Sequence, residues 1–160
     1  MTEMSALLDE ILPPTDSVRE THHFGVDPVP RAVREVRGFV RARVRGLADE
    51  TESSVLLLTS ELVTNAVLHA RTRIEVTLAL SAESVVVLVH DEDVALPEQD
   101  PYGPREGGWG LGLVQALADS WAMHRQSSGG KTVWFRVLRA GSRHVEDGAA
   151  ARRGPERRDS

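Results

Sequence analysis

The segment Ser60-Glu61-Leu62-Val63-Thr64-Asn65-Ala66-Val67-Leu68-His69 has the periodicity of an amphipathic helix and sets the fold prediction for the chain. Glu61, Asn65 and His69 recur at steps of four, so they share one helix face. An amide oxygen is a hard neutral ligand suited to magnesium, and a carboxylate one turn away can orient or deprotonate a water or a hydroxyl. Taken alone, this helix fits either a ligand site or an ordinary solvated face.

Length and composition indicate a globular chain with one core. The 160 residues correspond to one domain, with 41% hydrophobic and 27% charged residues. The net charge of −5 argues against a protein built to hold nucleic acid. The chain has no cysteine, which excludes disulfides, thiol nucleophiles and cysteine-based zinc sites. The longest apolar run, Val85 to Val89, is too short to span a membrane, and no signal peptide is evident, so we expect a cytoplasmic protein.

The periodicity divides the chain into three parts. Residues 1–17 are expected to be a loose lead-in, residues 18–139 one folded domain, and residues 140–160 a disordered polar tail. In the domain we predict helices from Asp27-Pro28 to about Ala48, from about Glu52 to Ala70, and from the glycine-rich segment to about Ser120. The predicted strands are Val18–Phe24, a run from Ile74 to Leu80, Val85–Val89, Trp121–Arg125 and Thr132–Arg139.

Asp91 closes the most apolar predicted strand, just before a loop of irregular sequence from Glu92 to Gly107. A buried carboxylate in that place is costly unless it is hydrogen-bonded. The amino group of a planar heterocycle such as adenine would satisfy it, and capping of the following turn is the structural alternative. A loop of this length in a compact domain is often a lid.

Glycines recur in the segment Gly108-Trp109-Gly110-Leu111-Gly112 at the predicted start of a helix. The spacing fits neither a dinucleotide fingerprint nor, at Gly129-Gly130-Lys131-Thr132, a Walker A loop, because a strand follows Thr132. Backbone N–H groups at a helix N-terminus favour a phosphate. A flexible hinge is the alternative.

Arginines cover one face of the first predicted domain helix, at positions 31, 34, 37, 41, 43 and 45. This face is either solvated or a docking surface for an acidic protein. Direct DNA binding is not expected, because no second recognition helix and no overall basic charge support it.

The order of these motifs resembles that of the GHKL ATPase superfamily, and within it the small bacterial anti-sigma-factor serine kinases. The combination of ELVTNAVLHA with GWGLGLV carries the resemblance, which spans about Val18 to Arg139. It implies an α/β two-layer sandwich with a mixed, mainly antiparallel sheet and helices on one face, the GHKL or Bergerat ATP-binding fold.

The resemblance also implies roles for single residues. Glu61 matches the family's catalytic base, Asn65 its magnesium-chelating asparagine, and Asp91 the aspartate that accepts from the adenine amine. The family usually has glycine two residues after that aspartate, where this chain has Asp93. Thr132 matches a threonine beside the adenine pocket, and Gly108, Gly110, Leu111 and Gly112 fall in the phosphate-contacting glycine box.

By this resemblance the protein is an ATP- and Mg²⁺-dependent serine kinase that phosphorylates an anti-anti-sigma (STAS-type) partner and binds a sigma factor, with a homodimer as a further possibility. Three rival functions remain. They are a nucleotide-dependent interaction module without phosphotransfer, the ATP-binding half of a sensor histidine kinase, and a DNA-binding regulator.

Overall fold

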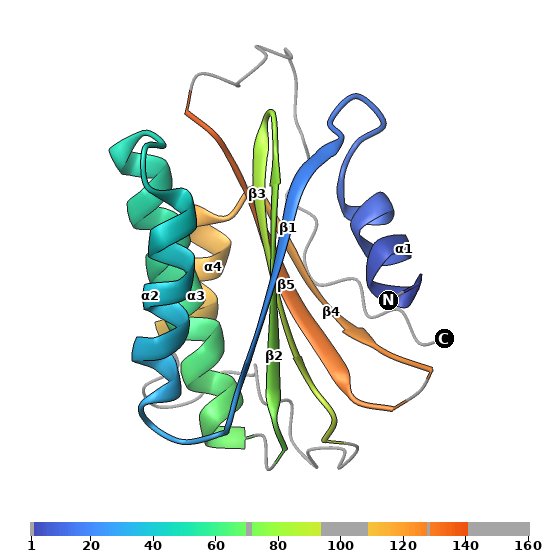
Figure 1. The fold of residues 1–160 in the computed structure, drawn as a ribbon, viewed down its shortest axis with the longest axis vertical. Helices are drawn as coiled ribbons and strands as arrows, with labels where there is room; N and C mark the ends of the chain where they lie inside the picture. Colours follow the sequence, from blue (N-terminus) through green and yellow to red (C-terminus); the bar gives the residue numbers. More distant parts are fainter. Residues whose placement is uncertain (1, 70–71, 94–108, 128, 141–160) are drawn as a thin grey trace.

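The computed structural model describes residues 2–69, 72–93, 109–127 and 129–140, and these form one antiparallel sheet with helices on both faces (Figure 1). The helices are α1 (Thr2–Ile11), α2 (Ala32–Val44), α3 (Asp49–His69) and α4 (Trp109–Leu117). The strands are β1 (Val18–Val26), β2 (Ile74–Ser81), β3 (Ser84–Asp91), β4 (Ser120–Arg125) and β5 (Lys131–Leu138), in the spatial order β1-β2-β3-β5-β4.

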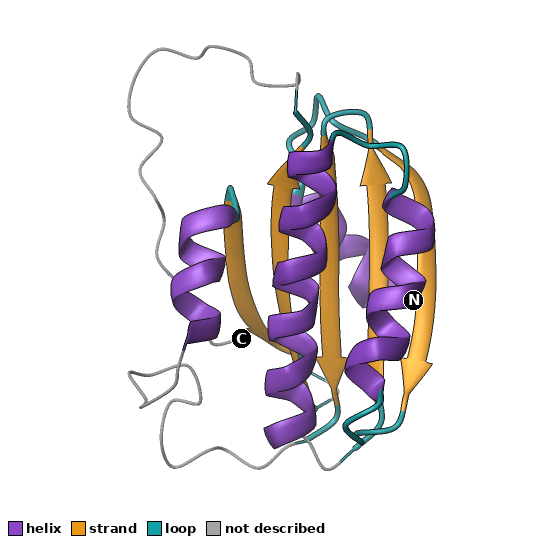
Figure 2. Cartoon of the chain, turned by 90° about the vertical axis from the view of Figure 1, so that its left-hand side faces the viewer, coloured by secondary structure: helices purple, strands orange, loops and turns teal. Residues whose placement is uncertain are grey.

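Helices α2, α3 and α4 form a layer on one face of the sheet, as Figures 1 and 2 show. This arrangement confirms the predicted α/β sandwich. The sheet is not mixed, however, because all four pairs of neighbouring strands are antiparallel. Strand β4 does run in the same direction as β3, but β5 lies between them. None of the helices that the structure describes is long and apolar enough to span a membrane.

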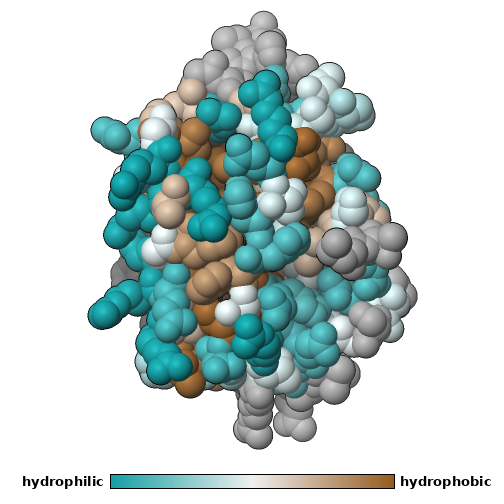
Figure 3. Space-filling model, viewed as in Figure 1, coloured by the Kyte–Doolittle hydropathy of each residue, from teal (hydrophilic) through white to brown (hydrophobic). Residues whose placement is uncertain are grey.

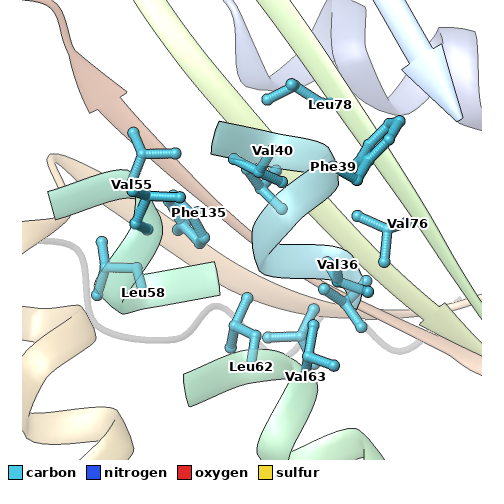
Figure 4. Packing of buried hydrophobic residues seen from close by; sticks show 14 of the residues in the cluster. Val36, Phe39, Val40, Val55, Leu58, Leu62, Val63, Val76, Leu78 and Phe135 are labelled. Atoms are coloured by element: carbon cyan, nitrogen blue, oxygen red, sulfur yellow. The ribbon is translucent and has the colours of Figure 1, made fainter. Parts of the chain in front are cut away.

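The main core lies between this helix layer and the sheet (Figure 4). Helix α3 contributes Val55, Leu58, Leu62 and Val63 at helical spacing, and Phe135 of β5 meets them from the sheet. Each of these five side chains is at most 3% exposed. Burial of a side chain of this size is worth roughly 1.5–3 kcal/mol. The apolar stripe of α3 therefore fixes this helix, with its polar residues, over the centre of the sheet.

Helix α1 covers the opposite face of the sheet, so helices lie on both faces and not on one face as predicted. The predicted loose lead-in over residues 1–17 is likewise wrong for most of its length. It buries Leu7, Leu8 and Ile11 against residues of β2, β3 and β5. The apolar residues stand at positions 7, 8, 11 and 12, a helical stripe that is too short to be distinctive before Pro13-Pro14 ends it. The extra helix explains why β3 is buried along its whole length: it is covered on both faces.

Helix α2 begins at Ala32, five residues after the Asp27-Pro28 pair that was expected to start it. Pro30 disfavours helical geometry at Val29, and the Ala32 N–H instead donates to the Val29 carbonyl in a turn. The helix ends at Val44, before Gly46 with a φ of 96°. A left-handed glycine just past the last turn is a frequent helix terminator.

The segment that leads from α1 to β1 is tied to the sheet by Asp16, which is 2% exposed. Its carboxylate accepts hydrogen bonds from the Ser81 hydroxyl at 2.7 Å and the Glu83 N–H at 3.2 Å. Arg136 lies 3.9 Å away. Burial alone would raise the pKa of Asp16, but these hydrogen bonds, one from Ser84 and the Arg136 charge outweigh it and lower the pKa.

We predict that Asp16→Asn destabilises the fold by about 1–3 kcal/mol at neutral pH, because a charge-assisted network loses its anion. A carboxyl with a lowered folded-state pKa stabilises above its unfolded pKa of 3.8 and loses that effect as the pH falls through the folded value. Urea unfolding of both proteins should therefore give free energies that converge below about pH 4. A difference that is constant with pH would contradict this account.

Candidate functional site

Asp91 is the last residue of β3 and lies on the sheet face that the helix layer covers. Side chains alternate along a strand, and Val85, Val87 and Val89 all point into the main core. Asp91 is 3% exposed. Its Oδ1 accepts the Asp93 N–H at 3.0 Å, so the predicted capping role accounts for one oxygen.

The second oxygen of Asp91 receives no hydrogen bond from the residues that the structure describes. Its ionic neighbour is the Nζ of Lys131, 3.8 Å from Oδ2. Burial raises the pKa of Asp91, although the Lys131 charge, the Asp93 N–H and His90 act in the opposite direction. Asp91 is thus a buried carboxylate with acceptor capacity that the described residues leave unused.

Glu61 and Asn65 lie one turn apart on α3, as predicted, and both are half-buried. Among the described residues neither side chain forms a hydrogen bond or an ion pair, whereas Thr64 between them donates to the Ser60 carbonyl. Helix α3 packs against α4 and against β3 and β5. An unpaired carboxylate and an unpaired amide therefore share one helix with the core residues that hold it over the sheet.

The glycine-rich segment leads into α4 as expected: the helix begins at Trp109 and contains Gly110, Leu111 and Gly112 in its first turn. Gly108 and positions 94–107 of the predicted lid lie outside the described residues. Contact of these glycines with phosphate remains a prediction.

Thr132 lies on the opposite face of the sheet from Asp91, and its place beside an adenine pocket stays a prediction. It is fully buried, its Oγ1 lies 3.1 Å from His90 Nδ1, and it accepts from Gln126 Nε2 at 3.1 Å. Strand alternation places Thr132 and His90 on the α1 side of the sheet, one residue out of phase with Asp91.

Lys131 occupies the place on the Asp91 side that had been expected for Thr132. It is the direct partner of Asp91 in the β3–β5 register. The sequence signal was present, since Val133, Phe135 and Val137 mark the core-facing phase of β5 and Lys131 continues it.

Gly130 allows the β4–β5 turn to pass close to the end of β3. Its φ is 85°, and a Cβ built on it would overlap the Asp91 carbonyl oxygen. A side chain at this position must therefore move backbone, which flexible neighbours cannot absorb.

We predict that Gly130→Ala lowers thermal stability and displaces Asp91, because the new methyl group meets backbone at a positive φ. Gly38→Ala in α2 is the matched control, since nothing lies within 4 Å of its added Cβ. That change should raise stability by about 0.5–1 kcal/mol. Equal effects of the two substitutions in a thermal melt would refute the close approach.

The arginine face of α2 is only partly available for a partner. Arg37 donates to the Ser60 hydroxyl at 2.8 Å, and Arg43 donates to the Phe39 carbonyl with its guanidinium 3.9 Å from the Phe39 ring centroid. Arg31 pairs with Glu35. Three exposed arginines have no partner among the described residues, and we call them the basic surface: Arg34, Arg41 and Arg45.

Figure 3 shows the hydropathy of one face of the molecule, viewed as in Figure 1. The margin formed by α2 is hydrophilic, and hydrophobic side chains gather in the seam between α2 and β1. Phe24 of β1 and Phe39 of α2 stack in this seam, with ring centroids 4.8 Å apart.

Comparison with known proteins agrees with this architecture. The family model described as a histidine kinase-like ATPase domain matches residues 26–137. A solved structure of the RsbU and RsbW domains of Rv1364c from Mycobacterium tuberculosis is similar, with a TM-score of 0.58 and 24% sequence identity. The match covers 79% of this chain and 35% of that one. No curated protein matches the chain.

Proposed function

Because the chain belongs to the histidine kinase-like ATPase domain family, we propose that it is an ATP-binding regulatory protein of the anti-sigma-factor kinase type. Its substrate would be a serine of an anti-anti-sigma (STAS-type) protein, and a sigma factor would be its second partner. The motif order from Glu61 to the last strand supports the proposal, together with the similarity to a protein that carries an RsbW domain. The proposed place of action is the cytoplasm, with a homodimer left open.

The proposal that the protein binds a nucleotide rests on Asp91 Oδ2, which accepts no hydrogen bond from the described residues. A carboxylate that is 3% exposed, with one oxygen lacking a hydrogen bond from the described residues, is costly without a donor. The exocyclic amine of adenine would supply that donor. A water-filled or purely structural site would need other donors around Oδ2.

Asn65 would hold a magnesium ion together with the phosphates of the nucleotide. A single amide oxygen fits magnesium, which takes few protein ligands beside phosphates and waters. When bound, the ion would neutralise phosphate charge.

Glu61 would act as the general base on the hydroxyl that receives the phosphate. Its carboxylate has no competing partner among the described residues, and it is half-buried one turn from Asn65. A free carboxylate in this place can accept a proton without first breaking an ion pair.

The alternative function is a nucleotide-dependent interaction module that does not transfer phosphate. Asp93, standing where the superfamily usually has glycine, favours this alternative because it adds negative charge beside the adenine-binding carboxylate. Nucleotide binding without turnover would distinguish the module from the kinase.

We predict that Asp91→Asn weakens ATP binding at least ten-fold by calorimetry. The added NH₂ would face the donor of the base, and loss of a hydrogen bond to a charged group costs about 1.5–3 kcal/mol. Asp9→Asn is the control, since Asp9 is exposed on α1 across the sheet. Unchanged ATP affinity in Asp91→Asn would remove Asp91 from the site.

Glu61→Gln and Asn65→Ala should fail in different ways. The first keeps the shape of the side chain but cannot take a proton, so phosphotransfer should fall about 10²–10⁴-fold with ATP affinity within a few-fold. The second should instead abolish the magnesium dependence of ATP binding. Glu61→Gln with wild-type turnover would assign the base to another residue, with His69 the first to test.

The basic surface is the proposed docking site for an acidic partner. Reversal of charge in Arg34→Glu together with Arg41→Glu should weaken capture of the partner and leave ATP affinity unchanged, since neither arginine side chain has a partner among the described residues. Arg37→Glu is an informative contrast, because it should also cost stability through Ser60. If the double variant still captures the partner, the basic surface is an ordinary solvated face and not a docking site.

A further inference from the structure

Lys131 lies beside Asp91, in a position from which it could contact a second polar atom of a bound base. It is the only lysine of the sequence and is 9% exposed. Its Nζ is 3.8 Å from Asp91 Oδ2, and its side chain makes no other contact of ionic or hydrogen-bonding kind with the residues that the structure describes.

The distance matters because it exceeds that of a hydrogen bond. Donor and acceptor atoms of an N–H···O bond lie 2.7–3.2 Å apart, so the ammonium attracts Asp91 without saturating it. An ammonium carries three N–H donors, and burying them unfilled is costly. An unfilled donor therefore lies next to an unfilled acceptor, both on the face of the sheet that α3 and α4 cover.

The other buried carboxylate with a cationic neighbour shows what a structural pair looks like in this fold. Asp16 accepts from a hydroxyl and from a backbone N–H, and its neighbour Arg136 donates to the Ser84 hydroxyl at 2.7 Å. Every charged group in that cluster has a short hydrogen bond. Within the described part of the chain, the Asp91–Lys131 pair has only the hydrogen bond from the Asp93 N–H to one carboxylate oxygen. A simple counter-ion role therefore leaves the other polar atoms of the pair unexplained.

Adenine presents the matching pair of groups on adjacent ring atoms: a donor at the N6 amine and an acceptor at N1. We propose that Lys131 is a base-reading residue that donates to adenine N1 while Asp91 accepts from N6. The proposal rests on the proposed function, since it needs an adenine nucleotide at Asp91. Guanine carries an acceptor at O6 and a hydrogen on N1, so the same pair would discriminate against it.

The test compares ATP with 1-deaza-ATP, which keeps the amine but has C–H in place of N1. Wild-type protein should bind 1-deaza-ATP about ten-fold or more weakly than ATP in calorimetry, since a hydrogen bond to a charged group is lost. In Lys131→Met the two nucleotides should bind equally, within about two-fold. The readout is the ratio of the dissociation constants of ATP and 1-deaza-ATP within each protein, so a general loss of affinity cancels.

Two controls make the result specific. The triphosphate of purine riboside, which lacks the amine but keeps N1, should bind more weakly than ATP in wild type and in Lys131→Met alike, because Asp91 remains. Lys131→Leu provides a second loss of the ammonium with a smaller side chain that has no donor, should the methionine variant fail to fold by circular dichroism.

The outcomes separate the inference from the proposed function. Equal binding of ATP and 1-deaza-ATP by wild type, or discrimination that survives in Lys131→Met and Lys131→Leu, would overturn the role of Lys131 and leave ATP binding intact. Absence of binding of any adenine nucleotide by wild type would overturn the proposed function, and the inference with it.

Discussion

The antiparallel register of β3 against β5 is the constraint on which the candidate site depends. It places Asp91 opposite Lys131 and His90 opposite Thr132. The register is held by the core, because Val85, Val87 and Val89 of β3 and Phe135 of β5 face the α3 side of the sheet, and a slip by one residue would turn all of them away. The chemistry at the strand end is therefore set by packing further along the same strands.

Helices cover both faces of the sheet, so the His90–Thr132 pair and the Asp91–Lys131 pair lie in different surroundings. On the α1 side, His90 and Thr132 bond to one another and Gln126 completes the cluster, so its polar groups are used within the fold. On the α3 side, Asp91 and Lys131 stay 3.8 Å apart. Since α1 packs over the outer face, only the inner pair faces the layer that holds Glu61 and Asn65.

Sequence patterns predicted the parts of this structure that rest on local periodicity. The α3 stripe, the β2–β3 hairpin and the position of Asp91 at a strand end were all evident from spacing. The errors come from longer-range effects. Helix α1 owes its stability to a sheet face assembled from β2, β3 and β5. Tertiary packing of this kind commonly decides whether a short helix forms.

The candidate site also depends on long-range contacts that local sequence patterns do not contain. Thr132 was assigned to the adenine pocket by the order of the motifs. It is one residue out of phase with Lys131, so it lies on the opposite face of the sheet from Asp91. Lys131 belongs to no recognised motif, and its importance follows only from its contact with Asp91, forty residues earlier in the chain. Only the register of two strands brings these residues together, and no local pattern contains that register.

Electrostatics links Asp93, which stands where the family usually has glycine, to Lys131. Asp93 raises the pKa of Asp91 by like-charge repulsion, and Lys131 acts in the opposite direction. The three side chains together carry the net charge of one aspartate, so the charge of Lys131 offsets that of Asp93. Buried ion pairs contribute little net stability, because desolvation cancels most of their attraction. The effect of Lys131 on the Asp91 carboxylate is thus a better explanation for this residue than the stability of the sheet.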